Sequence, residues 1–146
     1  MLSTPVLFKL IHVMSAAILF GGVTFGALVF TLANRVARSS APDVARLCVG
    51  ASYLTLAALI VQPVTGFVLI SVLDDSAMQP WLQVTYALFL LILGGWVGQT
   101  VMLRQMAAGA MERFNIWALF AWGSVVLLCL VFYLMIAQPA LWSHAG

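Results

Sequence analysis

Charged side chains are scarce in this sequence of 146 residues: Asp, Glu, Lys and Arg together make up 7%, whereas hydrophobic residues make up 64%. A water-soluble domain of this length cannot bury so much apolar surface, so that class is excluded. The few charges lie in groups, and four uncharged runs separate them, at positions 10–34, 47–73, 78–103 and 114–137. Because a membrane helix needs about 20 mostly apolar residues, each run is long enough to cross a bilayer.

Cysteine is nearly absent, and the common catalytic motifs are missing. Cys48 and Cys129 stand alone in the sequence, so neither a disulfide framework nor a thiolate metal site is expected. There is no glycine-rich phosphate loop, HExxH run or GxSxG run, which argues against the enzymes that these motifs define. The formal net charge is only +2, and we therefore expect no nucleic acid as a partner.

The first apolar run has a rival interpretation, a cleaved signal peptide. Such a peptide begins with a basic segment and contains an apolar stretch of roughly 7–15 residues. Here Lys9 falls inside the predicted helix, and the apolar run at 10–34 is longer than such a stretch. We therefore expect a retained helix.

The whole pattern predicts an all-α integral membrane protein, built as a four-helix up-and-down bundle. The connections between the apolar runs are short, so consecutive helices should pack antiparallel. Residues 1–146 are expected to form a single transmembrane domain, with helices at approximately 6–33, 43–73, 80–104 and 112–138. The lipid bilayer is the partner that this architecture implies.

The placement of arginine predicts the orientation in the membrane. The arginines all lie in the first and third connections, at positions 35, 38, 46, 104 and 113. The second connection contains Asp74 and Asp75 and no basic residue. Since cytoplasmic loops carry an excess of Lys and Arg, both termini and the acidic loop are expected on the non-cytoplasmic side, together with Lys9.

His12 is the only histidine inside any of the four apolar runs. An ionisable group in hydrocarbon is costly and by default marks a functional site. Lys9 lies one turn away on the same helix face, and a nearby positive charge and a dry environment both favour the neutral imidazole. Because the neutral form is the one that binds metals, His12 is the candidate metal ligand.

Two further polar residues are expected at the depth of His12. Gln62 and Thr65 flank Pro63 in the second run, and proline interrupts the hydrogen-bond ladder of a helix. The candidate cofactor-binding residues are therefore His12, Lys9, Gln62 and Thr65. The predicted cytoplasmic half contains few polar residues beyond Ser52, Tyr53, Gln99 and Thr100, which predicts a single polar site near the outer face.

Each of these residues also has a purely structural interpretation, and the sequence leaves both open. Lys9 would reach from the helix end to the membrane surface. Gln62 and Thr65 would hold neighbouring helices together by hydrogen bonds. His12 would then be a buried side chain with a structural hydrogen-bond partner.

Haem b is the cofactor that a buried neutral histidine favours most. A four-helix bundle offers an apolar slot between its helices, with His12 as the axial ligand of the iron and Lys9 placed for the propionates. The second iron ligand would be a methionine or come from a second subunit, so a homodimer is one expected state. The predicted function is haem b binding in membrane redox chemistry or haem handling.

Two alternative functions remain, and no enzymatic reaction is assigned. The first alternative is a small accessory or structural subunit of a larger membrane complex, with glycine-rich helix faces as its interfaces. The second is a carrier of protons or small molecules that uses the irregular helix around Pro63. The lack of a buried carboxylate in the apolar runs argues against the proton carrier.

Short segments along nearly the whole chain carry a family resemblance. They are residues 8–17 (FKLIHVMSAA), followed by Phe20-Gly21-Gly22, then 62–66 (QPVTG) and 133–139 (YLMIAQP). With these segments the chain resembles an uncharacterised bacterial family of predicted four-helix integral membrane proteins. The resemblance implies a multi-pass protein of the bacterial inner membrane and no known reaction.

The opening Lys9-x-x-His12 and the closing x-Pro139 are more distantly similar to the HemJ-type protoporphyrinogen oxidase family, four-helix membrane proteins associated with haem. Thr85 and Gly95 stand where that family has a lysine and a second histidine. Only Lys9 and His12 therefore carry over, as haem-site residues. Oxidation of protoporphyrinogen is not implied.

Overall fold

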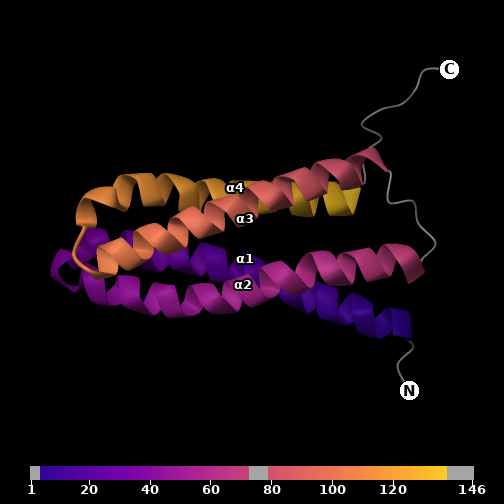
Figure 1. Ribbon diagram of the computed structural model, residues 1–146, viewed down its shortest axis with the longest axis horizontal. Coiled ribbons are helices and arrows are strands. Elements are labelled where there is room, and N and C mark those ends of the chain that lie inside the picture. Colours follow the sequence, from indigo (N-terminus) through magenta and orange to yellow (C-terminus); the bar gives the residue numbers. More distant parts are fainter. Residues whose placement is uncertain (1–3, 73–78, 138–146) are drawn as a thin grey trace.

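The computed structural model describes residues 4–72 and 79–137, which form four long helices. The helices are α1 (Thr4–Val36), α2 (Ala41–Val72), α3 (Pro80–Ala107) and α4 (Phe114–Ala137), with short 3-10 helices η1 (Arg38–Ser40) and η2 (Met111–Arg113). Figure 1 shows the four helices lying along one another and alternating in direction. The described residues are thus all-α and pack up-and-down, as predicted.

The helix ends differ from the predicted ones by a few residues. α1 and α3 continue beyond 33 and 104 because Arg35 and Arg104 belong to their last turns, where a positive charge complements the helix dipole. The connection after α3 contains Gly109 at a φ of 103°, a conformation that favours glycine at a helix end. α4 begins at Phe114 because residues 111–113 form η2. The predicted ends at 73 and 138 lie outside the described residues.

All four helices are long and apolar enough to cross a membrane. The 33 residues of α1 extend about 50 Å at about 1.5 Å per residue, more than the roughly 30 Å of hydrocarbon in a bilayer. Large apolar side chains cover the outside, and Phe25, Leu119 and Ile136 are 65%, 73% and 85% exposed. Such a surface requires lipid around it, so the protein is a multi-pass integral membrane protein.

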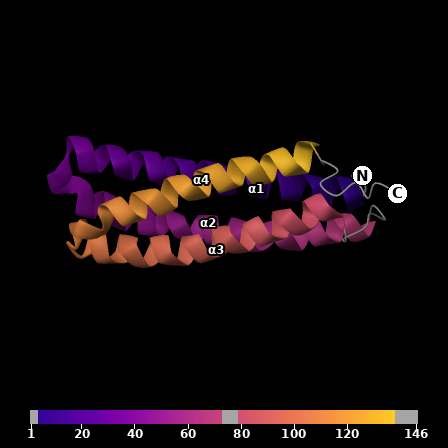
Figure 2. The same ribbon diagram turned by 90° about the horizontal axis from the view of Figure 1, so that it is seen from above.

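The helices form a closed ring of neighbours. α1 packs chiefly against α2, and α3 against α4, while α2 also contacts α3 and α1 contacts α4. Figure 2 shows α1 alongside α4 on one side of the bundle and α3 with α2 on the other. The arginines lie where α1 is joined to α2 and α3 to α4, and we call this the arginine end. We call the opposite end, where α1 begins, the Lys9 end.

The core has two layers of buried side chains. Near the arginine end, Phe30 and Trp117 meet edge to face with their ring centroids 4.7 Å apart. In the middle of the bundle each helix contributes one side chain that is at most 2% exposed: Leu19, Leu59, Ile92 and Leu128. We call these four residues the apolar layer. It divides the interior of the bundle into two halves.

Candidate functional site

His12 lies between α1 and α2, seven residues from the apolar layer toward the Lys9 end. Its Nδ1 is 2.9 Å from Thr65 Oγ1, and its Nε2 is 3.0 Å from Gln62 Nε2. Gln62 and Thr65 are 7% and 5% exposed. The structure therefore brings together three of the residues that the sequence predicts for the site.

Ser15 joins these residues, although the sequence prediction did not include it. Its Oγ is 2.5 Å from Gln62 Oε1 and 2.9 Å from the backbone oxygen of His12. Its spacing from His12 is the feature of the sequence that could have indicated this, since residues three apart share a helix face. We call His12, Ser15, Gln62 and Thr65 the His12 cluster.

The proton positions in the His12 cluster follow from its donors and acceptors. Thr65 Oγ1 lies 2.8 Å from the backbone oxygen of Val61, which can only accept, so the hydroxyl donates there and accepts a hydrogen bond from Nδ1–H of His12. Nε2 then has no proton and accepts an N–H of Gln62, whose Oε1 accepts the hydroxyl of Ser15. A neutral imidazole protonated at Nδ1 thus satisfies every side chain of the cluster.

Two residues of α2 shape the surroundings of the imidazole. Pro63 lies inside the helix and has no N–H, so the backbone oxygen of Leu59 lacks its usual helical donor. A Cβ added to Gly66 would lie 3.3 Å from His12 Cε1, which is tighter than ordinary contact. Glycine at this position therefore lets the ring approach α2 closely.

Lys9 lies apart from the His12 cluster. It is exposed, and within residues 4–72 and 79–137 it forms no hydrogen bond or ion pair. Its place near the start of α1 fits a side chain that reaches toward the membrane surface. Lys9 therefore takes no part in the hydrogen bonds of the His12 cluster, and its role in cofactor binding stays a prediction.

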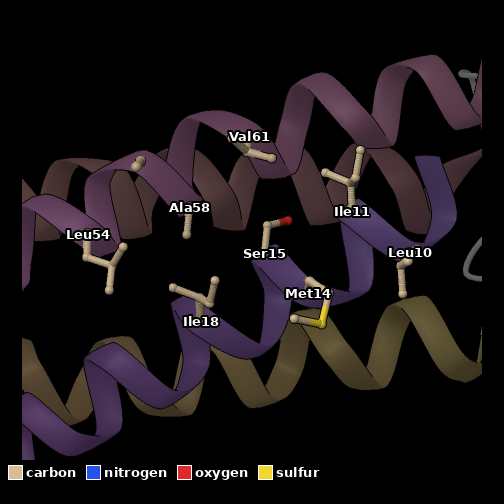
Figure 3. A pocket seen from close by; sticks show the side chains of 9 residues that line it. Leu10, Ile11, Met14, Ser15, Ile18, Leu54, Ala58 and Val61 are labelled. Carbon is tan, nitrogen blue, oxygen red and sulfur yellow. The ribbon is translucent and has the colours of Figure 1, made fainter. Parts of the chain in front are cut away.

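A groove of about 350 Å³ runs along α1 and α2 beside the His12 cluster (Figure 3). Its walls are apolar and consist of Leu10, Ile11, Met14 and Ile18 from α1 and Leu54, Ala57, Ala58 and Val61 from α2. Of the described residues that line it, only Ser15 is polar, and its hydroxyl points from α1 toward α2 (Figure 3). A chain of hydrogen bonds therefore connects the groove wall through Gln62 to His12.

The geometry of the His12 cluster determines whether His12 can ligate haem iron. An axial ligand needs a free nitrogen directed at the iron, whereas both ring nitrogens of His12 are engaged by side chains of α2. His12 is also not among the residues that line the groove. In this arrangement neither ring nitrogen of His12 is free to bind haem iron, and haem binding stays a prediction.

Polar residues also come together in the half toward the arginine end. Ser52, Thr55, Thr100 and Trp117 line a second, smaller cavity. Beside it, Gln99 Nε2 donates to Ser124 Oγ over 2.8 Å, and Trp96 Nε1 donates to the backbone oxygen of Ser52 over 3.2 Å. Side chains from all four helices thus meet in this half too, while the prediction of a single functional site near the outer face stays a prediction.

The fold and its apolar surface define a class, the multi-pass integral membrane proteins. Residues 6–139 match the family described as "Predicted integral membrane protein (DUF2269)", and the chain belongs to that family. No curated protein and no solved structure matches the chain. The predicted resemblance to an uncharacterised membrane-protein family is confirmed. The distant resemblance to the HemJ-type family stays a prediction.

Proposed function

We propose that the protein binds a lipid-soluble, amphipathic small molecule in the groove between α1 and α2, with Ser15 of the His12 cluster as the polar group on the groove wall. The observation that carries the proposal is the position of Ser15, which lines the groove and is hydrogen-bonded to Gln62. Binding sites for small molecules are mostly apolar and contain a few polar groups that fix the orientation of the ligand. The groove and the cluster together have this composition.

The chemistry of the cluster limits the kind of polar group that it would accept. The cluster contains no charged side chain in the arrangement described, and its donors and acceptors are two hydroxyls, an amide and a neutral imidazole. An ionic headgroup would find no opposite charge there, whereas a hydroxyl could donate to Ser15 Oγ, whose own proton is directed at Gln62 Oε1. We therefore propose a ligand with an uncharged polar group and a hydrocarbon body.

Haem b is the occupant that the sequence predicts, and it remains a candidate. Because both ring nitrogens of His12 are engaged, axial ligation requires the imidazole to leave Gln62 or Thr65. Protein incubated with haem would then show a Soret band that shifts with dithionite and disappears in His12→Ala. A spectrum that is the same for the wild type and His12→Ala would exclude His12 as the iron ligand.

The ligand proposal is tested by filling the groove. Ala57 lines the groove and is exposed, while Ala87 is exposed on α3 and lies outside it. The protein is purified in mild detergent, and the small molecules that copurify with it are extracted and measured by mass spectrometry. Ala57→Leu should lose a molecule that the wild type and the matched control Ala87→Leu retain in stoichiometric amounts. Bulk phospholipid in equal proportions from all three proteins would contradict the proposal.

Ser15→Ala tests the polar group of the groove wall separately. It removes the hydroxyl that joins the groove wall to Gln62 and leaves the apolar walls unchanged. The loss of one neutral hydrogen bond, about 0.5–1.5 kcal/mol, corresponds to roughly two- to tenfold weaker retention of the ligand. Retention equal to that of the wild type would show that the ligand does not use this hydroxyl.

The accessory-subunit function is the second candidate. Gly94 and Gly98 on α3 have nothing within 4 Å of an added Cβ, and small residues four apart allow close helix contact in membranes. A homodimer or a larger membrane complex would cover this face. Purification in mild detergent should then yield a stoichiometric partner or a dimer that Gly94→Leu disrupts, and a monomer under all conditions would reject this candidate.

A further inference from the structure

The interior of the bundle contains a second cavity, of about 50 Å³, on the arginine side of the apolar layer. Its lining comes from all four helices and includes Gly22, Gly26, Ser52, Thr55, Thr100 and Trp117. An added Cβ on Gly26 would have nothing within 4 Å. The missing side chain of Gly26 therefore leaves part of this space open.

Two residues that line the cavity each have a buried polar atom without a partner among the described residues. Thr100 Oγ1 and Trp117 Nε1 form no hydrogen bond with any described residue, and the two residues are 6% and 2% exposed. Thr65 and Thr85, in contrast, donate to the carbonyl four residues earlier in their own helices. An indole N–H has no such option within its own helix. Leaving these atoms unsatisfied away from water is unfavourable, because each has lost its hydrogen bonds to water without replacing them.

The lining determines which occupant would satisfy these atoms. It contains hydroxyl, amide, thiol and indole groups and no charged side chain, so an ion would be poorly compensated. An apolar molecule would leave Thr100 Oγ1 and Trp117 Nε1 unpaired. A water molecule needs about 10–15 Å³ of such space and two to four polar partners, and the cavity offers both.

We propose that the cavity holds a small cluster of ordered water molecules, about three by volume. These waters accept a hydrogen bond from the indole N–H of Trp117 and form a hydrogen bond with the hydroxyl of Thr100. The hydroxyls of Ser52 and Thr55 donate to their own helix carbonyls and have lone pairs left to accept from this water. The water is separate from the His12 cluster, because the apolar layer lies between them with each of its four side chains at most 2% exposed.

The experiment measures water at the indole of Trp117. Protein labelled with ¹⁵N at tryptophan is placed in nanodiscs of deuterated lipid, and Trp117→Phe identifies its indole signal by NMR. A cross peak between the Trp117 indole proton and water is expected, although this residue is only 2% exposed. An indole proton without a water cross peak, in a protein with an otherwise folded spectrum, would overturn the proposal.

A matched pair of variants locates the water. Gly26→Ala adds a methyl group at the cavity without a clash, and Gly21→Ala adds the same group on the exposed side of α1. The water cross peak of Trp117 should weaken severalfold in Gly26→Ala and stay unchanged in Gly21→Ala. A cross peak of full strength in both variants would mean that water reaches Trp117 from elsewhere, which would overturn the assignment to this cavity.

Discussion

The imidazole of His12 uses both of its nitrogens to hold α1 against α2, so its removal should weaken this contact by a measurable amount. Hydrogen bonds between transmembrane helices contribute about 0.6 kcal/mol on average and at most about 1.7 kcal/mol. A double-mutant cycle of His12→Ala and Thr65→Val, measured by reversible unfolding in detergent, should give a coupling energy within this range. Valine keeps the branched shape of threonine and removes only the hydroxyl.

Ser71 provides the control for this cycle. Its hydroxyl donates to the backbone oxygen of Phe67 in the same helix, and the side chain is exposed. Ser71→Ala should therefore show no coupling to His12→Ala. An equally small coupling for Thr65→Val would mean that the hydrogen bond between Thr65 and the ring contributes nothing to the association of α1 and α2.

At the scale of single residues, the sequence predicted the partners of His12 better than it predicted the extent of the site. Gln62 and Thr65 could be placed at its depth because antiparallel helices fix which residues share a level. Ser15 was not among the predicted residues, because its contact with Gln62 depends on the pairing of α1 with α2. Lys9 was included for its spacing from His12, its charge and the HemJ-type resemblance, and none of these says whether a long side chain turns inward or outward.

At the scale of the helix pair, adjacent glycines of α1 meet different surroundings. A Cβ on Gly22 would lie 2.8 Å from Thr55 Oγ1, whereas one on Gly21 would have nothing within 4 Å. Glycine destabilises a helix interior relative to alanine, and Gly21→Ala and Gly22→Ala remove this destabilisation equally. Gly22→Ala should therefore lower the free energy of unfolding relative to Gly21→Ala by about 1–3 kcal/mol, the usual cost of overpacking.

Unfolding of the two variants side by side checks this packing of α1 on α2. The contribution of helix propensity to the difference in stability cancels, because the two positions are neighbours in the middle of one helix. Equal stability would mean that Gly22 does not face Thr55 as described. A more stable Gly22→Ala would mean that the two helices have room to spare at this level.

The sequence predicts where the helices lie, but it does not predict which face of each helix points into the bundle. In a membrane both the core and the surroundings are apolar, so buried Leu19 and exposed Leu119, at 1% and 73% exposure, are chemically the same residue. Amphipathic periodicity, which reveals the core face of a soluble helix, is therefore weak here. The cavity at Thr100 and Trp117 was missed for this reason.

At the scale of the whole molecule, the arginine end and the Lys9 end predict an orientation. If the positive-inside rule holds, the arginine end is cytoplasmic. In a variant whose native cysteines are replaced by alanine, a cysteine at Thr4 should react with a membrane-impermeant maleimide in intact spheroplasts. A cysteine at Ser39, between Arg38 and α2, should react only after permeabilisation.

The reverse labelling pattern would contradict this orientation without changing the fold. The His12 cluster would then lie toward the cytoplasm, and a ligand in the groove would enter from the inner leaflet. Labelling at both positions before permeabilisation would instead indicate leaky spheroplasts or two orientations. An assay of a cytoplasmic enzyme with a membrane-impermeant substrate distinguishes these two results, because only leaky spheroplasts would show activity.

The most direct test of the groove is to identify what occupies it in the membrane. A photoreactive benzophenone side chain in place of Ile18, which lines the groove, is compared with one in place of Leu119, which is 73% exposed on α4. We expect position 18 to give an adduct of one defined mass, carrying an uncharged polar group, that Ala57→Leu suppresses and that position 119 lacks. The same mixture of phospholipid adducts at both positions would contradict the account.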